Sequence, residues 1–225
     1  MYDPYRTKPQ PEYYSRNKTN VMKVTGEGRI QVQPDKAEVS LGASTEDEQL
    51  LKAQQENARI VSNIKTALNN IGVKDEHIQT INYSIYPQYD FADGKQIFKG
   101  YKVDHVLAIT VEQIENTGLV VDTAVASGAN MVSRVKFEVA DYSWHYQQAL
   151  SKAIQDTLLK AETIANSLRV HLIKTPFSVT EAPLGSGGPA PMQMNAFVKS
   201  DASTPIQSGT IEIYSRVTAE YAYYY

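Results

Sequence analysis

Hydrophobic and polar residues alternate along several stretches of this chain, while elsewhere the apolar positions recur every three or four residues. Alternation is typical of a strand with one buried face, and the longer period is typical of an amphipathic helix. Residues 24–32 and 37–41 alternate and are separated by the turn-forming stretch 33–36, which predicts a β-hairpin. A last alternating stretch, 210–221, predicts a strand that we expect to be prone to act as a sheet edge. Its row of apolar residues comprises Ile211, Ile213, Val217, Ala219 and Tyr221.

Two long segments follow the helical period instead. Residues 49–71 carry an apolar face and end before Gly72, where glycine suits a helix C-terminus. Residues 143–168 carry a second apolar face, flanked by Ala149 and Ala153, so we expect this helix to approach a sheet closely. The residues that we expect to point inward on it are Leu150, Ile154, Leu158, Ala161, Ile164, Ala165 and Leu168.

A shorter helix is predicted at 116–127, and further strands at 77–88, 100–111, 132–139 and 177–180. Asp93-Gly94 suits a hairpin turn between the first two of these strands. The order of the elements predicts an α+β fold in which long helices cover one face of a mostly antiparallel sheet.

We expect three parts along the chain. Residues 1–20 form a flexible, tyrosine-rich arm, 21–222 form the domain, and 223–225 form a tyrosine-rich tail. Within the domain, the glycine-, proline- and serine-rich residues 183–209 are predicted to form a flexible loop.

Composition narrows the function classes. The 225 residues carry a formal net charge of -3 with scattered basic residues, which argues against a nucleic-acid binder. The 0 cysteines exclude disulfides, thiolate metal sites and cysteine nucleophiles. No stretch approaches the ~18 apolar residues of a membrane-spanning helix, and the first residues lack the apolar core of a secretory signal. We therefore expect a soluble, cytoplasmic protein.

Gly26-Glu27-Gly28 raises the question of a phosphate-binding loop. A dinucleotide fingerprint needs a third glycine and then a helix, but Gln31 occupies that position and a strand pattern follows. We therefore interpret these glycines as a bulge or a site of close backbone packing. The four histidines lack metal-ligand spacing, and His105 is expected to be a partly buried strand residue. We identify no catalytic, cofactor-binding or metal-binding residue.

Two other features stand out as candidates for contact or oxidation. Tyrosine gathers at both ends of the chain, and this residue is enriched at interfaces. The candidate interaction residues are Tyr2, Tyr5, Tyr13, Tyr14, Tyr221, Tyr223, Tyr224 and Tyr225. Disordered termini are the alternative explanation. Met192 and Met194 lie in the predicted loop and are candidates for oxidation, or an incidental feature of its composition.

The order and spacing of several short motifs resemble the SIMPL-domain family, bacterial proteins related to a mammalian signalling-kinase-associated protein. The matching residues are Val24-Thr25-Gly26-Glu27-Gly28, Pro34-Asp35-Lys36-Ala37, Gly72 before Ile78-Gln79-Thr80, Pro87, Gly100-Tyr101, Gly128-Ala129-Asn130, Ala149, Ala153, Ala161, Ala165, Thr204-Pro205-Ile206 and Gly209. The chain departs from the family pattern at Leu168-Arg169-Val170, where the family usually has a glycine.

The resemblance implies βαβ-type units and assembly into large homo-oligomers, including rings. It also implies a link to oxidative-stress tolerance for some members and no established active site. Many members are exported, so the cell envelope is the alternative location.

Three functions follow from these observations. The first is a non-catalytic, self-assembling protein with a protective role under oxidative or general stress. The second is an enzyme or small-molecule binder with a site assembled from distant residues such as Tyr101, His105 and Glu112. The third is a surface or coat component that uses tyrosine for cross-linking.

Overall fold

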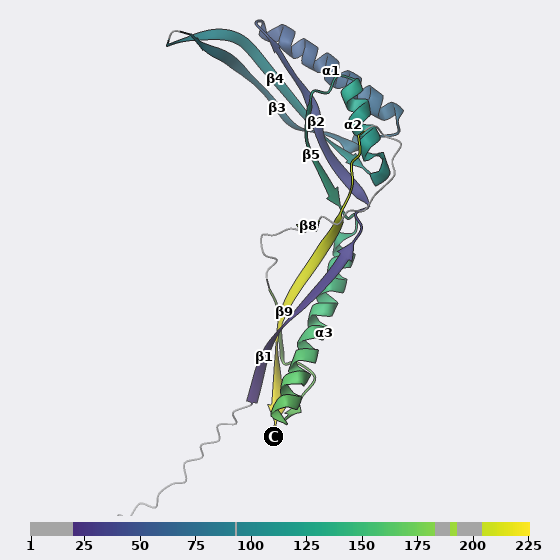
Figure 1. The fold of residues 1–225 in the computed structure, drawn as a ribbon, viewed down its shortest axis with the longest axis vertical. Coiled ribbons are helices and arrows are strands. Elements are labelled where there is room, and N and C mark those ends of the chain that lie inside the picture. The colour runs from purple at the N-terminus through teal and green to yellow at the C-terminus, as the bar shows by residue number, and fades with distance from the viewer. Residues whose placement is uncertain (1–19, 93, 183–189, 193–203) are drawn as a thin grey trace, which may run out of the picture. The chain divides into compact units, whose positions relative to one another are not determined.

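A computed structural model describes residues 20–92, 94–182, 190–192 and 204–225 (Figure 1). These residues fold into two compact units. Within the described chain, the first unit comprises 20–28, 150–182 and 215–225, and the second comprises 29–149, 190–192 and 204–214.

The second unit is built on an antiparallel sheet of β2 (Lys36–Asp47), β3 (Ile78–Ala92), β4 (Lys95–Val111) and β5 (Met131–Glu138), in the order β3-β4-β2-β5. Helix α1 (Leu50–Asn70) connects β2 to β3, and α2 (Thr117–Ala126) connects β4 to β5. β2 and β3 are parallel to each other, because both are antiparallel to β4. β4 and β5 are likewise parallel to each other, because both are antiparallel to β2. The result is two interlocked split βαβ units, the ferredoxin-like topology. This confirms the predicted α+β class and its βαβ-type units.

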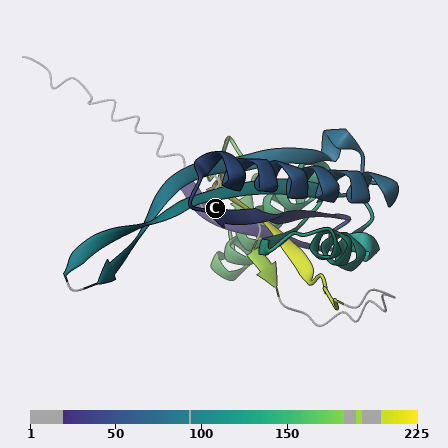
Figure 2. The same cartoon turned by 90° about the horizontal axis from the view of Figure 1, so that it is seen from above.

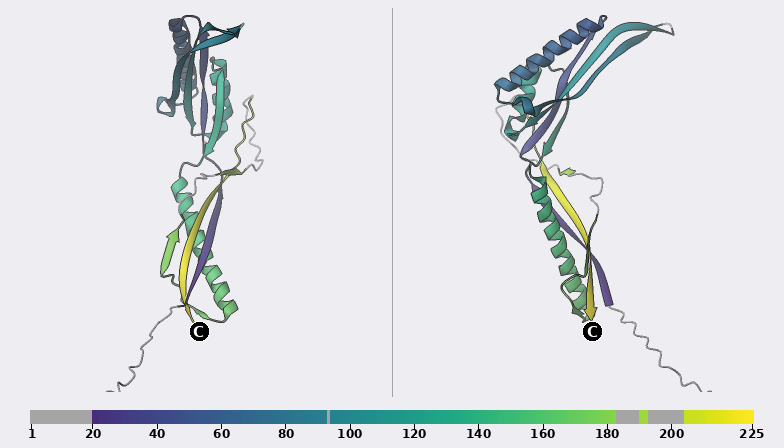
Figure 3. Two further views of the ribbon diagram at one scale, coloured as in Figure 1. Left: turned by 90° about the vertical axis from the view of Figure 1, so that its left-hand side faces the viewer. Right: turned by 180° about the vertical axis from the view of Figure 1, so that it is seen from behind.

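The core of the second unit lies between this sheet and its two helices (Figure 3). Its largest buried members include Val39, Leu41, Ile64, Leu68, Leu107 and Ile109. The predicted helix ends are confirmed by Gly72 and Gly128, which follow α1 and α2 at φ of 94° and 105°. The Val73 N–H donates to the Leu68 carbonyl at 3.1 Å, which closes α1 as glycine caps usually do. The predicted hairpin is confirmed too, with Gly94 at φ 73° between β3 and β4, whereas Asp93 lies outside the described residues.

The first unit places β9 (Thr210–Tyr224) between β1 (Asn20–Val32) on one side and β6 (His171–Leu172) and β7 (Ser178–Glu181) on the other. Contacts between β1 and β9 run in opposite directions along the two strands, so the pair is antiparallel. They are Lys23–Glu220 at 3.1 Å, Thr25–Thr218 at 3.3 Å and Glu27–Arg216 at 3.0 Å. The prediction that the last strand is prone to act as an edge is therefore wrong.

The predicted hairpin of residues 24–32 and 37–41 is also wrong, although both segments form strands. β1 pairs with β9, whereas β2 pairs with β4 and β5, so both hydrogen-bonding edges of β2 are occupied. The turn between them instead joins the end of β5, because the Asp35 N–H donates to the Glu138 carbonyl at 3.1 Å. Local turn chemistry was correct, but it does not determine which strands pair.

Helix α3 (Tyr142–Leu168) buries a row of small residues. Ala153, Thr157, Ala161 and Ala165 are buried in the first unit. Three of the predicted inward residues are exposed instead, with Ile154 at 41%, Ile164 at 37% and Leu168 at 58%. The physical reason is the closeness of β1, where a Cβ added to Gly26 would lie 2.1 Å from the Ala153 carbonyl oxygen. Only small residues fit at that separation, which confirms close packing as the role of Gly26.

The end of α3 also explains the departure from the family pattern. Arg169 has a φ of 55°, the left-handed conformation that favours glycine. The Val170 N–H donates to the Ala165 carbonyl at 3.0 Å, so the helix ends in the usual way with arginine in the glycine position.

The predicted loop 183–209 contains a short strand, β8 (Ala190–Met192), which pairs with Thr210–Glu212 of β9. Met192 therefore lies in a strand, whereas Met194 lies outside the described residues.

Candidate functional site

A two-stranded arm projects from the sheet of the second unit. The pairing of β4 with β2 ends where Tyr101 meets Asp47, whereas β3 and β4 continue to pair with each other as far as Ala92 and Lys95. We call residues 88–92 and 94–100 the arm. Figure 2 shows it twisting away beyond α1.

One face of this hairpin carries an exposed apolar row. Side chains two apart on a strand share a face, which places Tyr83, Ile85, Pro87, Tyr89 and Phe91 of β3 together. Phe98 of β4 lies opposite Tyr89, with ring centroids 5.7 Å apart. We call these six residues the aromatic row. Their exposed fractions are high: 46% for Tyr83, 38% for Ile85, 45% for Tyr89, 78% for Phe91 and 46% for Phe98.

The opposite face of the hairpin is mainly polar. Tyr86 donates its hydroxyl hydrogen to Asp104 Oδ2 at 2.7 Å, and this hydrogen bond raises the pKa of Tyr86. The Lys102 ammonium lies 5.9 Å from the centre of the Tyr86 ring, and Gln88 donates to Glu46 at 3.0 Å. Among the described residues of the hairpin, this face also exposes Ile97 at 52% and Tyr86 at 37%, but the longer apolar row is the aromatic row on the other face.

The outer edge of β3 is poorly suited to accept another strand. β3 is an edge strand, and pairing with β4 is maintained on both sides of Pro87. Proline has no N–H, and in sheets it is found where that group would face the open edge. A register shift between Thr80 and Asn82 adds a bulge at Ile81, a second device that disfavours edge pairing.

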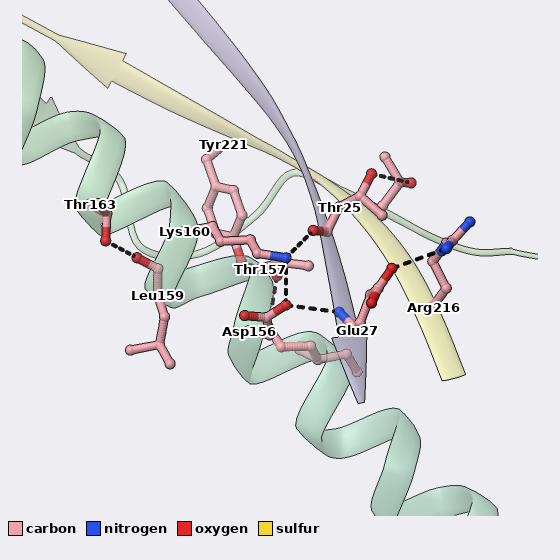
Figure 4. Close-up of polar contacts among 11 residues, drawn as sticks. Thr25, Glu27, Asp156, Thr157, Leu159, Lys160, Thr163, Arg216 and Tyr221 are labelled. Carbon is pink, nitrogen blue, oxygen red and sulfur yellow. Dashed lines mark hydrogen bonds and ion pairs between the residues drawn. The ribbon is translucent and has the colours of Figure 1, made fainter. Parts of the chain in front are cut away.

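The outer edge of β1 is covered by side chains from α3 (Figure 4). Asp156 Oδ2 accepts the Glu27 N–H at 2.8 Å, and Lys160 Nζ donates to the Thr25 carbonyl at 2.9 Å. The two side chains also pair with each other at 2.7 Å, one helical turn apart. Lys160 and the Glu27 N–H together lower the pKa of Asp156. We call Asp156 and Lys160 the edge clasp, because they satisfy backbone groups that a neighbouring strand would otherwise pair with.

A shallow groove of about 350 Å³ runs beside the edge clasp, between β1 and α3. Its lining is mostly apolar and consists of Val24, Thr25, Leu159, Lys160, Thr163 and Ile164. The lysine ammonium is already engaged by Asp156 and the Thr25 carbonyl. Convergent polar groups of the kind that orient a substrate are not present in this lining.

The residues proposed for a pocket assembled from distant positions do not converge. Tyr101 contacts Phe98, with ring centroids 5.2 Å apart. His105 Nε2 lies 2.9 Å from Thr80 Oγ1, and burial lowers the pKa of His105. Glu112 lies 3.6 Å from His77 Nε2. The described residues contain no cluster of three or more His, Asp or Glu side chains able to hold a metal ion.

The C-terminal tyrosines divide between core and surface. The proposal that Tyr221 is a contact residue is wrong, because its side chain is 1% exposed and its hydroxyl lies 2.8 Å from Thr157 Oγ1. Tyr223 and Tyr224 belong to β9 and not to a tail, and they pair with Leu172 and His171. Tyr224 and Tyr225 are 56% and 87% exposed. The N-terminal candidates Tyr2, Tyr5, Tyr13 and Tyr14 lie outside the described residues.

The sequence model of the SIMPL family, described as a protein of unknown function (DUF541), matches residues 22–221. The chain belongs to the SIMPL family. It is 27% identical over 154 residues to the 26 kDa periplasmic immunogenic proteins of Brucella melitensis and Brucella abortus, and 28% identical over 152 residues to the uncharacterized protein YggE of Escherichia coli K12. These alignments cover 66% of this chain but only 62%, 62% and 60% of the relatives, so the chain spans less than two thirds of their length.

These relatives correct the predicted location. The prediction of a cytoplasmic protein is wrong, because the two Brucella relatives are named as periplasmic proteins. Within the part of the chain that the structure describes, no helix is both long and apolar enough to cross a membrane.

Proposed function

We propose that this SIMPL protein is a non-catalytic, self-assembling protein of the bacterial cell envelope. The observation that carries the proposal is the exposed aromatic row on β3 and β4. Monomeric proteins rarely leave large contiguous apolar patches open to water, and such patches usually mark interaction sites. Phe91 is 78% exposed and Tyr89 is 45% exposed, so neither ring is a core residue.

The polar chemistry of the described chain supports a non-catalytic role. Its ionisable groups pair locally, as Asp156 does with Lys160 and Tyr86 does with Asp104. An active site would instead gather such groups around a concave pocket. The envelope location is supported by the Brucella relatives, which are named as periplasmic proteins.

Light scattering coupled to size exclusion tests self-assembly directly. We expect the purified chain at micromolar concentration to have a mass that is a multiple of 25.1 kDa. A mass of one chain across a tenfold concentration range, at near-physiological salt, would refute the proposal.

We further propose that the assembled protein contributes to tolerance of oxidative stress, as its resemblance to the family implies. A strain lacking the protein should survive peroxide less well than its parent, and a plasmid copy should restore survival. Equal survival of the two strains would remove the stress role while leaving self-assembly intact.

A further inference from the structure

We infer that two copies of this chain meet face to face through their aromatic rows, and not by adding strands at their sheet edges. The inference rests on the proposed self-assembly and identifies its interface. The partner is the aromatic row of a second copy of this chain, so the contact is isologous: the same surface is used on both chains.

The exposed area of the row is close to what a specific interface needs. An aromatic side chain offers about 200 Å², so the exposed fractions of Tyr83, Tyr89, Phe91 and Phe98 leave about 430 Å² open on each copy. With Ile85 and Pro87 included, covering two such rows removes about 1,000 Å² from water, near the lower bound for specific interfaces. The exposed row of one copy is thus large enough to cover the row of another.

The geometry of the strand edges disfavours strand addition as the alternative. Pro87 leaves a missing donor on the outer edge of β3, and the bulge at Ile81 disturbs the same edge. In the first unit, Asp156 and Lys160 already bond to the outer backbone groups of β1. The face of the β3–β4 hairpin has no such cover.

Charge favours another protein surface over a lipid surface as the occupant. Residues 88–101 contain two aspartates, Asp90 and Asp93, and two lysines, Lys95 and Lys99, so their net charge is zero. Segments that bind anionic membranes carry clusters of basic residues.

A first experiment removes the most exposed ring of the row, Phe91. We expect Phe91→Ser to lower the assembled mass at micromolar concentration by at least half, and Phe98→Ser to act in the same direction. Phe177→Ser is the matched control, because Phe177 is 59% exposed but belongs to the first unit, and its mass should equal that of the parent. Circular dichroism and the urea midpoint should be unchanged in all three variants, so that a lower mass reports contact and not unfolding.

A second experiment identifies which face is in contact. Since the chain has 0 cysteines, single-cysteine variants give clean cross-linking reports with a short bis-maleimide. We expect cross-linked dimers from Ile85→Cys and Tyr89→Cys on the row, and few from Ser84→Cys and Gln88→Cys on the other face. Strand addition at the edge would bring both faces of β3 to the partner, so equal cross-linking of the two pairs would overturn the inference.

The outcomes separate the two proposals. An assembled protein whose mass is unaffected by Phe91→Ser overturns the aromatic-row interface but leaves self-assembly standing. A parent protein that is monomeric overturns both. Loss of binding to phosphatidylglycerol vesicles in Phe91→Ser, with an unchanged mass, assigns the row to a lipid surface and also overturns the inference.

Discussion

Gly26 offers the sharpest test of how the first unit is packed. A Cβ at this position would lie 2.1 Å from the Ala153 carbonyl oxygen, 2.6 Å from Thr157 Cγ2 and 2.7 Å from the Thr157 backbone nitrogen. Two of these three atoms belong to the backbone of α3, so a side-chain rotation cannot relieve the overlap. Gly26→Ala therefore forces β1 and α3 apart.

The expected cost follows from two opposing effects. Replacing glycine with alanine stabilises a protein by about 0.4–1 kcal/mol where the backbone tolerates it, because the unfolded chain loses freedom. Overpacking a well-filled core costs about 1–3 kcal/mol, occasionally more. Since the clash here is with helix backbone, we use the upper end of that range and expect a net loss of about 2–3 kcal/mol. For a chain of this size, that corresponds to a fall in Tm of about 4–12 °C.

Urea unfolding followed by circular dichroism measures this loss. Thr25→Ala is the matched control, because Thr25 is the neighbouring residue on β1 but is exposed, and it should change stability by less than about 1 kcal/mol. The chain has two compact units. If the first unit unfolds in a transition of its own, we expect the midpoint of that transition to fall and the midpoint of the other unit to stay unchanged. A Gly26→Ala midpoint equal to that of the parent would refute the view that α3 and β1 touch at backbone distance.

Three further changes test other contacts. Tyr221→Phe removes the buried hydroxyl that lies 2.8 Å from Thr157 Oγ1, and should lower the free energy of unfolding by about 0.5–1.5 kcal/mol in urea titrations; no loss would contradict a formed hydrogen bond. Arg169→Gly should raise the melting temperature, because arginine at φ 55° carries about 1–2 kcal/mol of conformational cost that glycine avoids; a lower melting temperature would contradict the left-handed assignment. Burial lowers the pKa of His105 below its ordinary 6.5, so the neutral ring stabilises the fold above about pH 6.5 and this contribution is lost as pH falls through the folded pKa. The urea midpoint should therefore fall less between pH 7.5 and 5.5 in His105→Gln than in the parent, and equal falls would refute the assignment.

Sequence reasoning succeeded where the signal was local. The ends of α1 and α2 follow from glycines that adopt left-handed φ angles, and the turn between β3 and β4 follows from Gly94. Pairing between distant segments has no such signal. β1 pairs with β9, which lies almost at the other end of the chain, and the residues of neither strand identify the strand that it pairs with. The hairpin predicted from a local turn failed for that reason.

The buried face of α3 was predicted only in part: Ala161 and Ala165 are buried as expected, whereas three of the large residues are not, because apolar periodicity favours large side chains. Leu168 and Ile154 fit that pattern, yet the helix turns its small row of Ala153, Ala161 and Ala165 toward the sheet. Gly26 on β1 is the missing half of the explanation, since a strand without a side chain can approach only a helix with small ones. The signal was present as two separate patterns, alanines at helical spacing and a glycine in a strand, on segments more than a hundred residues apart.

The aromatic row was visible in the sequence as alternation but could not be recognised as a surface. Alternating apolar residues predict a buried face, and Val103 and Leu107 of β4 are indeed buried. Tyr89 and Phe91 follow the same rule yet are exposed, because they lie in the arm beyond the end of β2 at Asp47, where β3 and β4 extend past the rest of the sheet. Exposure depended on the relative lengths of β2 and β3, which periodicity does not determine.

The disrupted edge of β3, the covered edge of β1 and the open face of the hairpin together favour an assembly of finite size. Strand addition uses backbone groups that every chain carries, so it discriminates poorly between partners and continues as long as an edge stays open. Pairing through Tyr89, Phe91 and Phe98 depends on specific side chains instead. An isologous contact of this kind is complete once two rows cover each other. Larger assemblies would then require a second contact surface on each chain.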